Sequence, residues 1–339
     1  MTSTSVAPSP DKILWLSIVQ GWAILLVVID HVNGFTYSGE PGEFYPLSEW
    51  VHRFCYSFHM PLFMFVSGAL LYYSRIAKGW KVGSLYKDKL KRLLLPYICF
   101  TVIAFLIKAP LASVTKRGMD ISAAGFLNAL FDPANGPLGE LWFIGTLLWL
   151  MFMYPLYQTM LKSLWTEVIL LAVTLVPFIF GMETNVKGWL NISGVPQYAF
   201  YFVAGMLFFK YNGIRVFERS IWAAVAATVL YAGCFLLLPD GNLITATLGI
   251  LMSFGWGVRI AGKLNLFSSF RDHSFQIFLV GLFPQMFVEL VLWSRFHSEM
   301  ALLPFYIVSC LLALYSGVLL SKMASRLPCK YLRWGFGLK

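Results

Sequence analysis

The chain is organised as long apolar runs separated by short polar connections. In a helix, about 20 mostly apolar residues cross a hydrocarbon core. The approximate bounds of the runs that meet or approach this length are 13–32, 52–73, 93–113, 141–160, 165–181, 196–210, 219–238, 242–259, 274–294 and 301–323. The runs are continuous and lack the short alternating segments of a β-barrel. The pattern therefore predicts an all-α fold, a polytopic membrane helix bundle of about ten transmembrane helices.

The basic residues gather in alternate connections, of which 74–92 is the richest, with seven Lys and Arg. The acidic residues gather mainly in the other connections: Glu40, Glu43, Glu49, Asp120, Asp132, Glu140, Glu183, Asp240 and Glu299. Because Lys and Arg are retained on the cytoplasmic side, both termini are expected in the cytoplasm. The predicted organisation is a cytoplasmic N-terminal tail (1–12), a membrane domain (13–323) and a basic cytoplasmic C-terminal tail (324–339). The first run lacks an evident cleavage site, which favours a retained helix over a signal peptide.

Composition supports the membrane interpretation. Of the 339 residues 58% are hydrophobic and only 12% are charged, whereas soluble domains carry about 25% charged residues. The net charge of +10 could suggest nucleic acid, but the cations lie between apolar runs, where membrane topology explains them. Membrane lipids are therefore expected partners and nucleic acid is not. The five cysteines have no CxxC spacing and predict neither a disulfide framework nor a metal site.

The first two apolar runs contain polar side chains that are costly in a bilayer. Gln20 and His31 are eleven residues apart, so they share one helix face about 16 Å apart along the axis. His31, beside Asp30 near the outer end, is suited to proton transfer, although the pair could also be the hydrated end of a helix. His59 lies about two turns below the outer surface of the next helix. The alternative to a functional role for His59 is a structural histidine beside a kink at Pro61.

A cationic cluster precedes the third run. Lys89, Lys91 and Arg92 stand where a cytoplasmic phosphate could dock against the start of a helix, whose dipole adds attraction. The alternative is ordinary anchoring of a cytoplasmic loop. Glu140 and Glu289 are further acids of the outer half, and either could orient a histidine.

Together these segments resemble the acyltransferase-3 family of bacterial membrane O-acyltransferases. The matching stretches, in family order, are Gly21–His31, Phe58–Gly68, Lys89–Arg92 leading into Pro96–Tyr97, Leu141–Ile144 and Ser274–Leu279. The family's ten-helix bundle matches the architecture inferred from the apolar runs.

The resemblance implies transfer of an acyl group, often acetyl, from cytoplasmic acyl-CoA to a hydroxyl outside the membrane. Acceptors in the family are usually sugars of a surface glycan, and the expected location is the bacterial inner membrane. His31 would act as general base, oriented by Asp30 or Glu140, and His59 would bind or polarise the thioester. The expected donor-binding residues are Gln20, Lys89, Lys91, Arg92 and Trp142, and no metal is expected.

The sequence departs from the family pattern at two positions. The first-helix motif is an Arg and a His with ten residues between them, and here the Arg position is Gln20. Many members also have a His in the ninth helix where this chain has Val280-Gly281-Leu282. A member that binds but does not catalyse is therefore one alternative. A transporter or flippase of a glycan or lipid intermediate is another. Such folds often show inverted repeats and paired broken helices, and this chain shows one clear intramembrane Pro and no paired halves.

Overall fold

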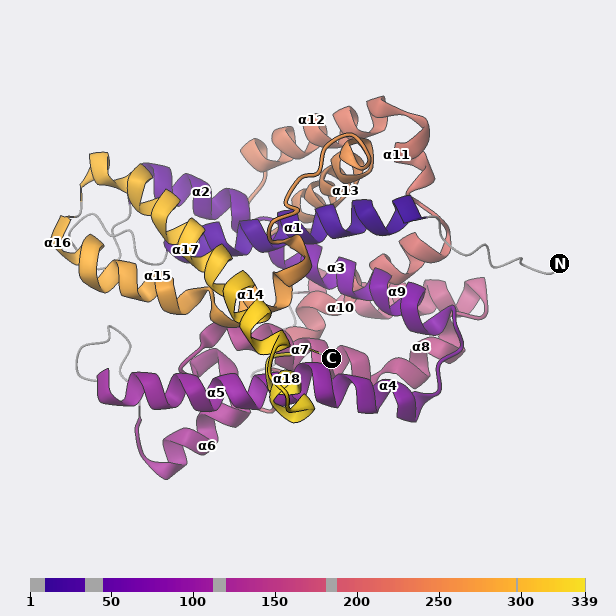
Figure 1. The fold of residues 1–339 in the computed structure, drawn as a ribbon. Coiled ribbons are helices and arrows are strands. Elements are labelled where there is room, and N and C mark those ends of the chain that lie inside the picture. The colour runs from indigo at the N-terminus through magenta and orange to yellow at the C-terminus, as the bar shows by residue number, and fades with distance from the viewer. Residues whose placement is uncertain (1–9, 34–44, 112–119, 181–187, 297, 339) are drawn as a thin grey trace. The chain divides into compact units, whose positions relative to one another are not determined.

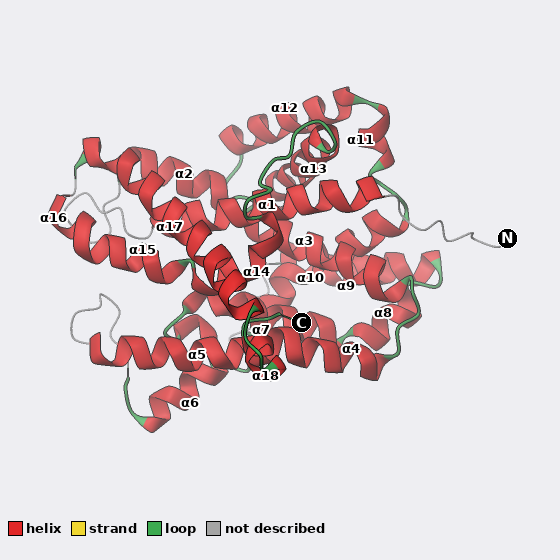
Figure 2. Ribbon diagram, viewed as in Figure 1, coloured by secondary structure: helices red, strands yellow, loops and turns green. Residues whose placement is uncertain are grey.

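The computed structural model describes residues 10–33, 45–111, 120–180, 188–296 and 298–338 (Figure 1). Throughout these residues the regular structure is helical, without a strand (Figure 2). The predicted all-α class is confirmed. The chain forms two compact units: unit one comprises residues 1–66 and 211–320, and unit two comprises residues 67–210 and 321–339.

Unit one is built from helices at both ends of the sequence. Its elements are α1 (Pro10–Asn33), α2 (Pro46–Tyr56), the start of α3 (His59–Leu71), α11 (Arg215–Arg219), α12 (Ile221–Leu237), α13 (Leu243–Ile260), η6 (Arg271–His273), α14 (Ser274–Val280), α15 (Leu282–Val288), η7 (Glu289–Trp293), α16 (Ser294–Phe296) and most of α17 (Glu299–Ser325).

Unit two contains the middle of the chain and its last helix. Its elements are η1 (Tyr72–Ile76), α4 (Val82–Lys89), η2 (Leu90–Leu94), α5 (Leu95–Lys108), η3 (Ala109–Leu111), α6 (Ala123–Phe131), η4 (Pro133–Asn135), η5 (Gly139–Leu141), α7 (Trp142–Phe152), α8 (Tyr154–Met160), α9 (Leu164–Ile179), α10 (Gly194–Lys210) and α18 (Lys330–Gly335).

Five helical segments are long and apolar enough to cross a membrane: Leu14–Val32, Pro46–Ile76, Val82–Lys108, Leu243–Ile260 and Glu299–Ser325. Two further spans are bent pairs: Gly139–Phe152 with Tyr154–Met160, bent by 49°, and Arg271–Val280 with Leu282–Phe296, bent by 59°. The described residues thus provide five to seven spans by length and composition. Each of the ten predicted runs overlaps a helix, but α9, α10 and α12 are shorter than a full span. Ten crossings and cytoplasmic termini stay predictions.

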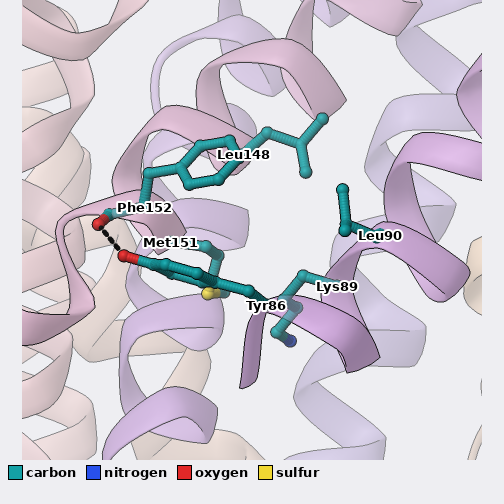
Figure 3. A pocket seen from close by; sticks show the side chains of 6 residues that line it. All are labelled: Tyr86, Lys89, Leu90, Leu148, Met151 and Phe152. Atoms are coloured by element: carbon teal, nitrogen blue, oxygen red, sulfur yellow. Dashed lines mark hydrogen bonds between the residues drawn. The ribbon is translucent and has the colours of Figure 1, made fainter. Parts of the chain in front are cut away.

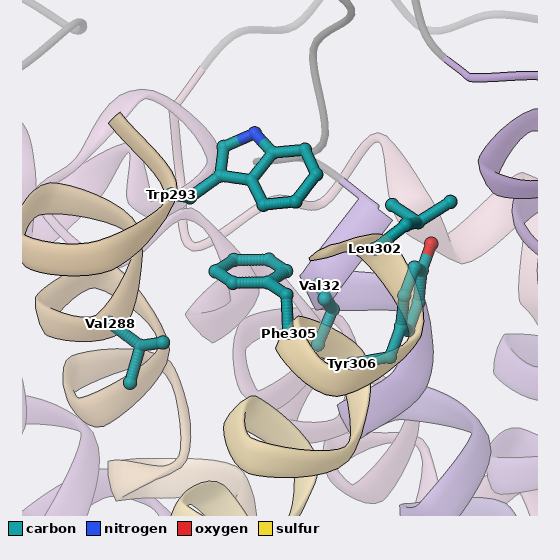
Figure 4. Close-up of a cluster of buried hydrophobic side chains, with 6 residues drawn as sticks. All are labelled: Val32, Val288, Trp293, Leu302, Phe305 and Tyr306. Carbon is teal, nitrogen blue, oxygen red and sulfur yellow. The ribbon is translucent and has the colours of Figure 1, made fainter. Parts of the chain in front are cut away.

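Helix α1 is the central element of unit one and packs against α2, α13, α14 and α15. A cluster of buried side chains at its end joins Val32 to the residues after the α14–α15 bend and to α17 (Figure 4). In this cluster the rings of Trp293 and Phe305 are 4.6 Å apart. The buried Gln285 of α15 also donates a hydrogen bond to the Val28 carbonyl, at 2.8 Å. These contacts fix the end of α1 that bears Asp30 and His31.

Close helix approach in unit one depends on a glycine. At Gly317 of α17, a Cβ would lie 2.5 Å from the Cα of Ile277 in α14 and 2.7 Å from its backbone nitrogen. Real Cβ contacts are essentially never shorter than 3.0 Å. The two helices can therefore be this close only because residue 317 has no side chain.

In unit two, α10 packs against α7 and α9, and α5 packs against α6 and α18. The buried carboxylate of Glu167 in α9 pairs with Lys210 at the end of α10. A charge buried this deeply needs a partner, so the pair ties the ends of these two helices together.

Candidate active site

The last turn of α1 presents the carboxylate of Asp30 to two histidines of the next helices. Its Oδ1 is 2.7 Å from Nδ1 of His52 in α2, and its Oδ2 is 3.9 Å from Nε2 of His59 in α3. The first contact is a hydrogen bond, and the second is within ion-pair distance when His59 is protonated. All three residues belong to unit one.

His31, the residue next to Asp30, is oriented by its own helix. Its Nδ1 lies 2.7 Å from the carbonyl oxygen of Val27, one turn earlier. A carbonyl only accepts hydrogen bonds, so Nδ1 donates and carries the hydrogen. In the neutral ring Nε2 is then the nitrogen with a free electron pair, which is the form that a general base requires. We expected Asp30 or Glu140 to orient this ring, but the hydrogen bond observed is to Val27.

His59 is held in the same way, with its Nδ1 2.7 Å from the Cys55 carbonyl. It is the first residue of α3, after a turn at Ser57 and Phe58 that separates α3 from α2. Pro61 therefore lies in the first turn of a helix, where its missing N–H removes no helical hydrogen bond. The expected kink within a continuous helix is replaced by the α2–α3 turn.

Exposure rises steadily across the cluster. The side chain is 2% exposed for His59, 10% for Asp30 and 52% for His52. The exposed His52 ring lies 5.1 Å from that of Tyr56, which is 5.6 Å from the His59 ring. The cluster thus runs from a buried imidazole, through a shared carboxylate, to an accessible imidazole.

His52 was not among the predicted site residues. The signal that could have found it is its spacing of seven residues from His59, which places both on nearly the same face of a helix. It is the first residue of the apolar run 52–73.

Gln20 lies on α1 next to a close contact with a distant segment. A Cβ at Gly21 would be 2.8 Å from the Cβ atoms of Phe267 and Arg271, so the stretch before α14 packs directly on α1 here. Arg271 donates a hydrogen bond to the Leu266 carbonyl at 2.8 Å. Arg271, from another part of unit one, thus contacts α1 beside Gln20 through its Cβ.

The predicted phosphate-binding cations lie in unit two, around the junction of α4 and η2. Arg92 Nε is 3.1 Å from a carboxylate oxygen of Asp88, and Arg75 is 3.0 Å from the other. Lys91 is exposed, and its ammonium group lies 4.3 Å from the ring centroid of Trp334. The charge of this region therefore remains strongly positive.

Lys89 lines a small pocket in unit two (Figure 3). The other lining residues are Tyr86, Leu90, Leu148, Met151 and Phe152. The Tyr86 hydroxyl donates a hydrogen bond to the Phe152 carbonyl at 2.7 Å and closes one side. The lining is otherwise apolar, which is suited to a hydrocarbon or thioether group better than to a phosphate.

Trp142 and Glu140 lie together at the start of α7. Trp142 is stacked on Tyr198, with ring centroids 5.2 Å apart and planes at 29°. Glu140 lies in the preceding turn η5. Both belong to unit two and His31 belongs to unit one, so orientation of His31 by Glu140 stays a prediction. Over the described ranges, no group of three or more His, Cys, Asp or Glu is arranged to hold a metal ion.

The fold and the cluster define a class: a multi-pass helical membrane protein in which a carboxylate of the first helix contacts two histidines. Residues 13–322 match the acyltransferase-3 family, described as an acyltransferase domain, and the chain belongs to this family. The resemblance inferred from the sequence is confirmed. The chain is thus a multi-pass membrane acyltransferase, with an acyl donor and an acceptor as its substrates. Neither a curated protein nor a solved structure matches the chain.

Proposed function

We propose that the protein is an O-acyltransferase of the bacterial inner membrane. It transfers an acyl group, in the first instance acetyl, from cytoplasmic acyl-CoA to a hydroxyl of an extracytoplasmic carbohydrate. The observation that carries the proposal is the His31 ring, whose Nε2 is available as a base, next in sequence to the Asp30 carboxylate that contacts His52 and His59. The carbohydrate acceptor rests on the likeness to the family and not on a sugar-binding motif in this chain.

The proposed reaction is one proton transfer coupled to one acyl transfer. His31 Nε2 takes the proton of the acceptor hydroxyl while the hydroxyl oxygen attacks the thioester carbonyl. The carbon–sulfur bond then breaks, the ester forms, and the CoA thiolate receives the proton back from His31. The Asp30 carboxylate stabilises the positive charge that His31 carries between these steps. In its protonated form His59 also carries a hydrogen on Nε2, with which it helps to bind or polarise the thioester.

The donor phosphates are assigned to the cations of unit two. Lys89, Lys91 and Arg92 supply the positive charge, and Asp88 fixes Arg92 in position through their ion pair. Trp142, stacked on Tyr198, is the aromatic surface assigned to the donor. Gln20 is assigned to a hydrogen bond with the pantetheine arm.

The test is acyl transfer by the His31→Ala variant. Purified protein in lipid nanodiscs is supplied with acetyl-CoA and the cell's own surface glycan, and free CoA and glycan ester are measured. General-base catalysis contributes about 10²- to 10⁴-fold, so a loss of this size is expected, with acetyl-CoA binding unchanged. The control is His273→Ala, which removes a histidine of η6.

The outcomes separate the alternatives. Activity of His31→Ala equal to that of His273→Ala refutes the assigned base. If the wild-type protein binds acetyl-CoA but releases no CoA, it is a family member that binds the donor without catalysing transfer. Wild-type protein that binds no acetyl-CoA, and instead moves a glycan lipid across the bilayer, is a transporter.

A further inference from the structure

The segment that follows α17 does not extend away from unit two but packs back onto it. Helix α18 contacts α5 and η2. Gly335 is buried against Cys99, where a Cβ would lie 3.2 Å from the Cys99 sulfur, and the Phe336 ring is 5.9 Å from that of Phe100. The family match ends at residue 322, so the family domain does not account for these contacts.

The docked segment brings Lys330 to the same ring as Lys91. The ammonium groups of Lys91 and Lys330 lie 4.3 and 5.9 Å from the ring centroid of Trp334, so one indole gathers a cation from η2 and another from α18. The next residue before this ring is Arg333. Its Nε is buried and has no hydrogen-bond partner among the described residues.

Such an arrangement is electrostatically incomplete. Like charges near one ring repel one another, and a buried guanidinium nitrogen without an acceptor costs free energy. Within the described parts of the chain, no carboxylate forms an ion pair with any of the three cations. An anion with several acceptor oxygens would satisfy the Arg333 nitrogen and offset the repulsion at once.

We propose that Lys91, Lys330 and Arg333 form a phosphate-binding site around Trp334. The site shares Lys91 with the cations assigned to the acyl donor. The phosphate site rests on the proposed function, which identifies the donor as acyl-CoA. It adds that the segment after α17 supplies two of the groups that hold the donor's phosphates. A phosphate of an anionic lipid headgroup has the same chemistry, and the experiment distinguishes the two sources.

The experiment compares Arg333→Gln with the full-length wild type in nanodiscs. Arg326→Gln is the matched control, since Arg326 is an exposed arginine between α17 and α18. Binding of CoA is measured by calorimetry in nanodiscs of phosphatidylcholine alone. Thermal stability is measured in the same nanodiscs with and without phosphatidylglycerol.

A hydrogen bond to a charged group contributes enough for the Kd for CoA to rise about tenfold or more in Arg333→Gln. The control should not change, and Arg333→Lys should recover part of the affinity. Unchanged CoA binding, with the stabilisation by phosphatidylglycerol lost only in Arg333→Gln, assigns the phosphate site to lipid.

If Arg333→Gln equals the control in both measurements, the phosphate site is refuted. This failure is distinct from failure of the proposed function. In the latter the wild type itself binds no CoA, whereas here the wild type binds CoA and the variant binds it equally well.

Discussion

The contact between α14 and α17 makes the Gly317→Ala substitution a sharp test of the packing in unit one. The added Cβ would lie 2.5 Å from the Cα of Ile277, whereas ordinary contacts are 3.4–4 Å, so the helices must separate locally by about 1 Å. Overpacking of this kind costs about 1–3 kcal/mol. Alanine is also the better helix former, which returns up to about 1 kcal/mol.

The control isolates the packing cost. Gly233 lies inside α12, and a Cβ there would meet nothing within 4 Å, so Gly233→Ala carries only the gain in helix propensity. The measurement is the Tm of both purified variants in one detergent, followed by intrinsic fluorescence. Gly317→Ala should unfold about 2–5 °C below Gly233→Ala. Equal Tm values, or a higher Tm for Gly317→Ala, would refute the close approach of the helices.

Three further predictions concern Asp30, Lys210 and Cys329. Asp30→Asn should lower kcat and leave the KM for acyl-CoA nearly unchanged, because the carboxylate is assigned to stabilising the protonated His31 ring and not to binding the donor. A selective rise in KM would contradict this role. Lys210→Met should destabilise the protein by about 3–5 kcal/mol by leaving the Glu167 carboxylate buried without its ammonium partner, and a Tm equal to wild type would contradict it. The backbone N–H groups of Leu332 and Tyr331 lower the pKa of the Cys329 thiol. In a variant that keeps only this cysteine, the rate of maleimide labelling should therefore reach its maximum at a lower pH than for a cysteine in an unstructured peptide. With cytoplasmic termini, a membrane-impermeant maleimide should label it in inverted vesicles and not in intact cells.

The helical class and the positions of the helices could be predicted because each depends on a local property. Uninterrupted apolar runs have few stable structures in a bilayer other than helices, since every backbone group needs an internal partner. The lengths of the helices could not be predicted in the same way. The run 52–73 does not show the turn at Ser57 and Phe58, because each of its residues is compatible with a continuous helix.

The candidate site was predicted in part for a similar reason. Asp30, His31 and His59 stand out individually as polar groups in apolar runs. The contact of Lys91 with Trp334 joins residues far apart in the sequence, and no local sequence pattern predicts it. In the sequence, Lys91 is equally compatible with a solvated loop. The docked position of α18 shows that this cation has an aromatic partner.

The Asp30 cluster brings together two histidines that are distant from each other along the chain axis. In a straight helix, His52 and His59 would be about 10 Å apart along the axis. A single carboxylate nevertheless lies 2.7 Å from one ring and 3.9 Å from the other. The turn between α2 and α3 lies between the two histidines, and its Ser57 hydroxyl hydrogen-bonds the Tyr231 hydroxyl at 2.9 Å. The sequence marks Asp30 and His59 as polar groups in apolar runs, whereas the sharing of one carboxylate by His52 and His59 is a tertiary contact that no local pattern predicts.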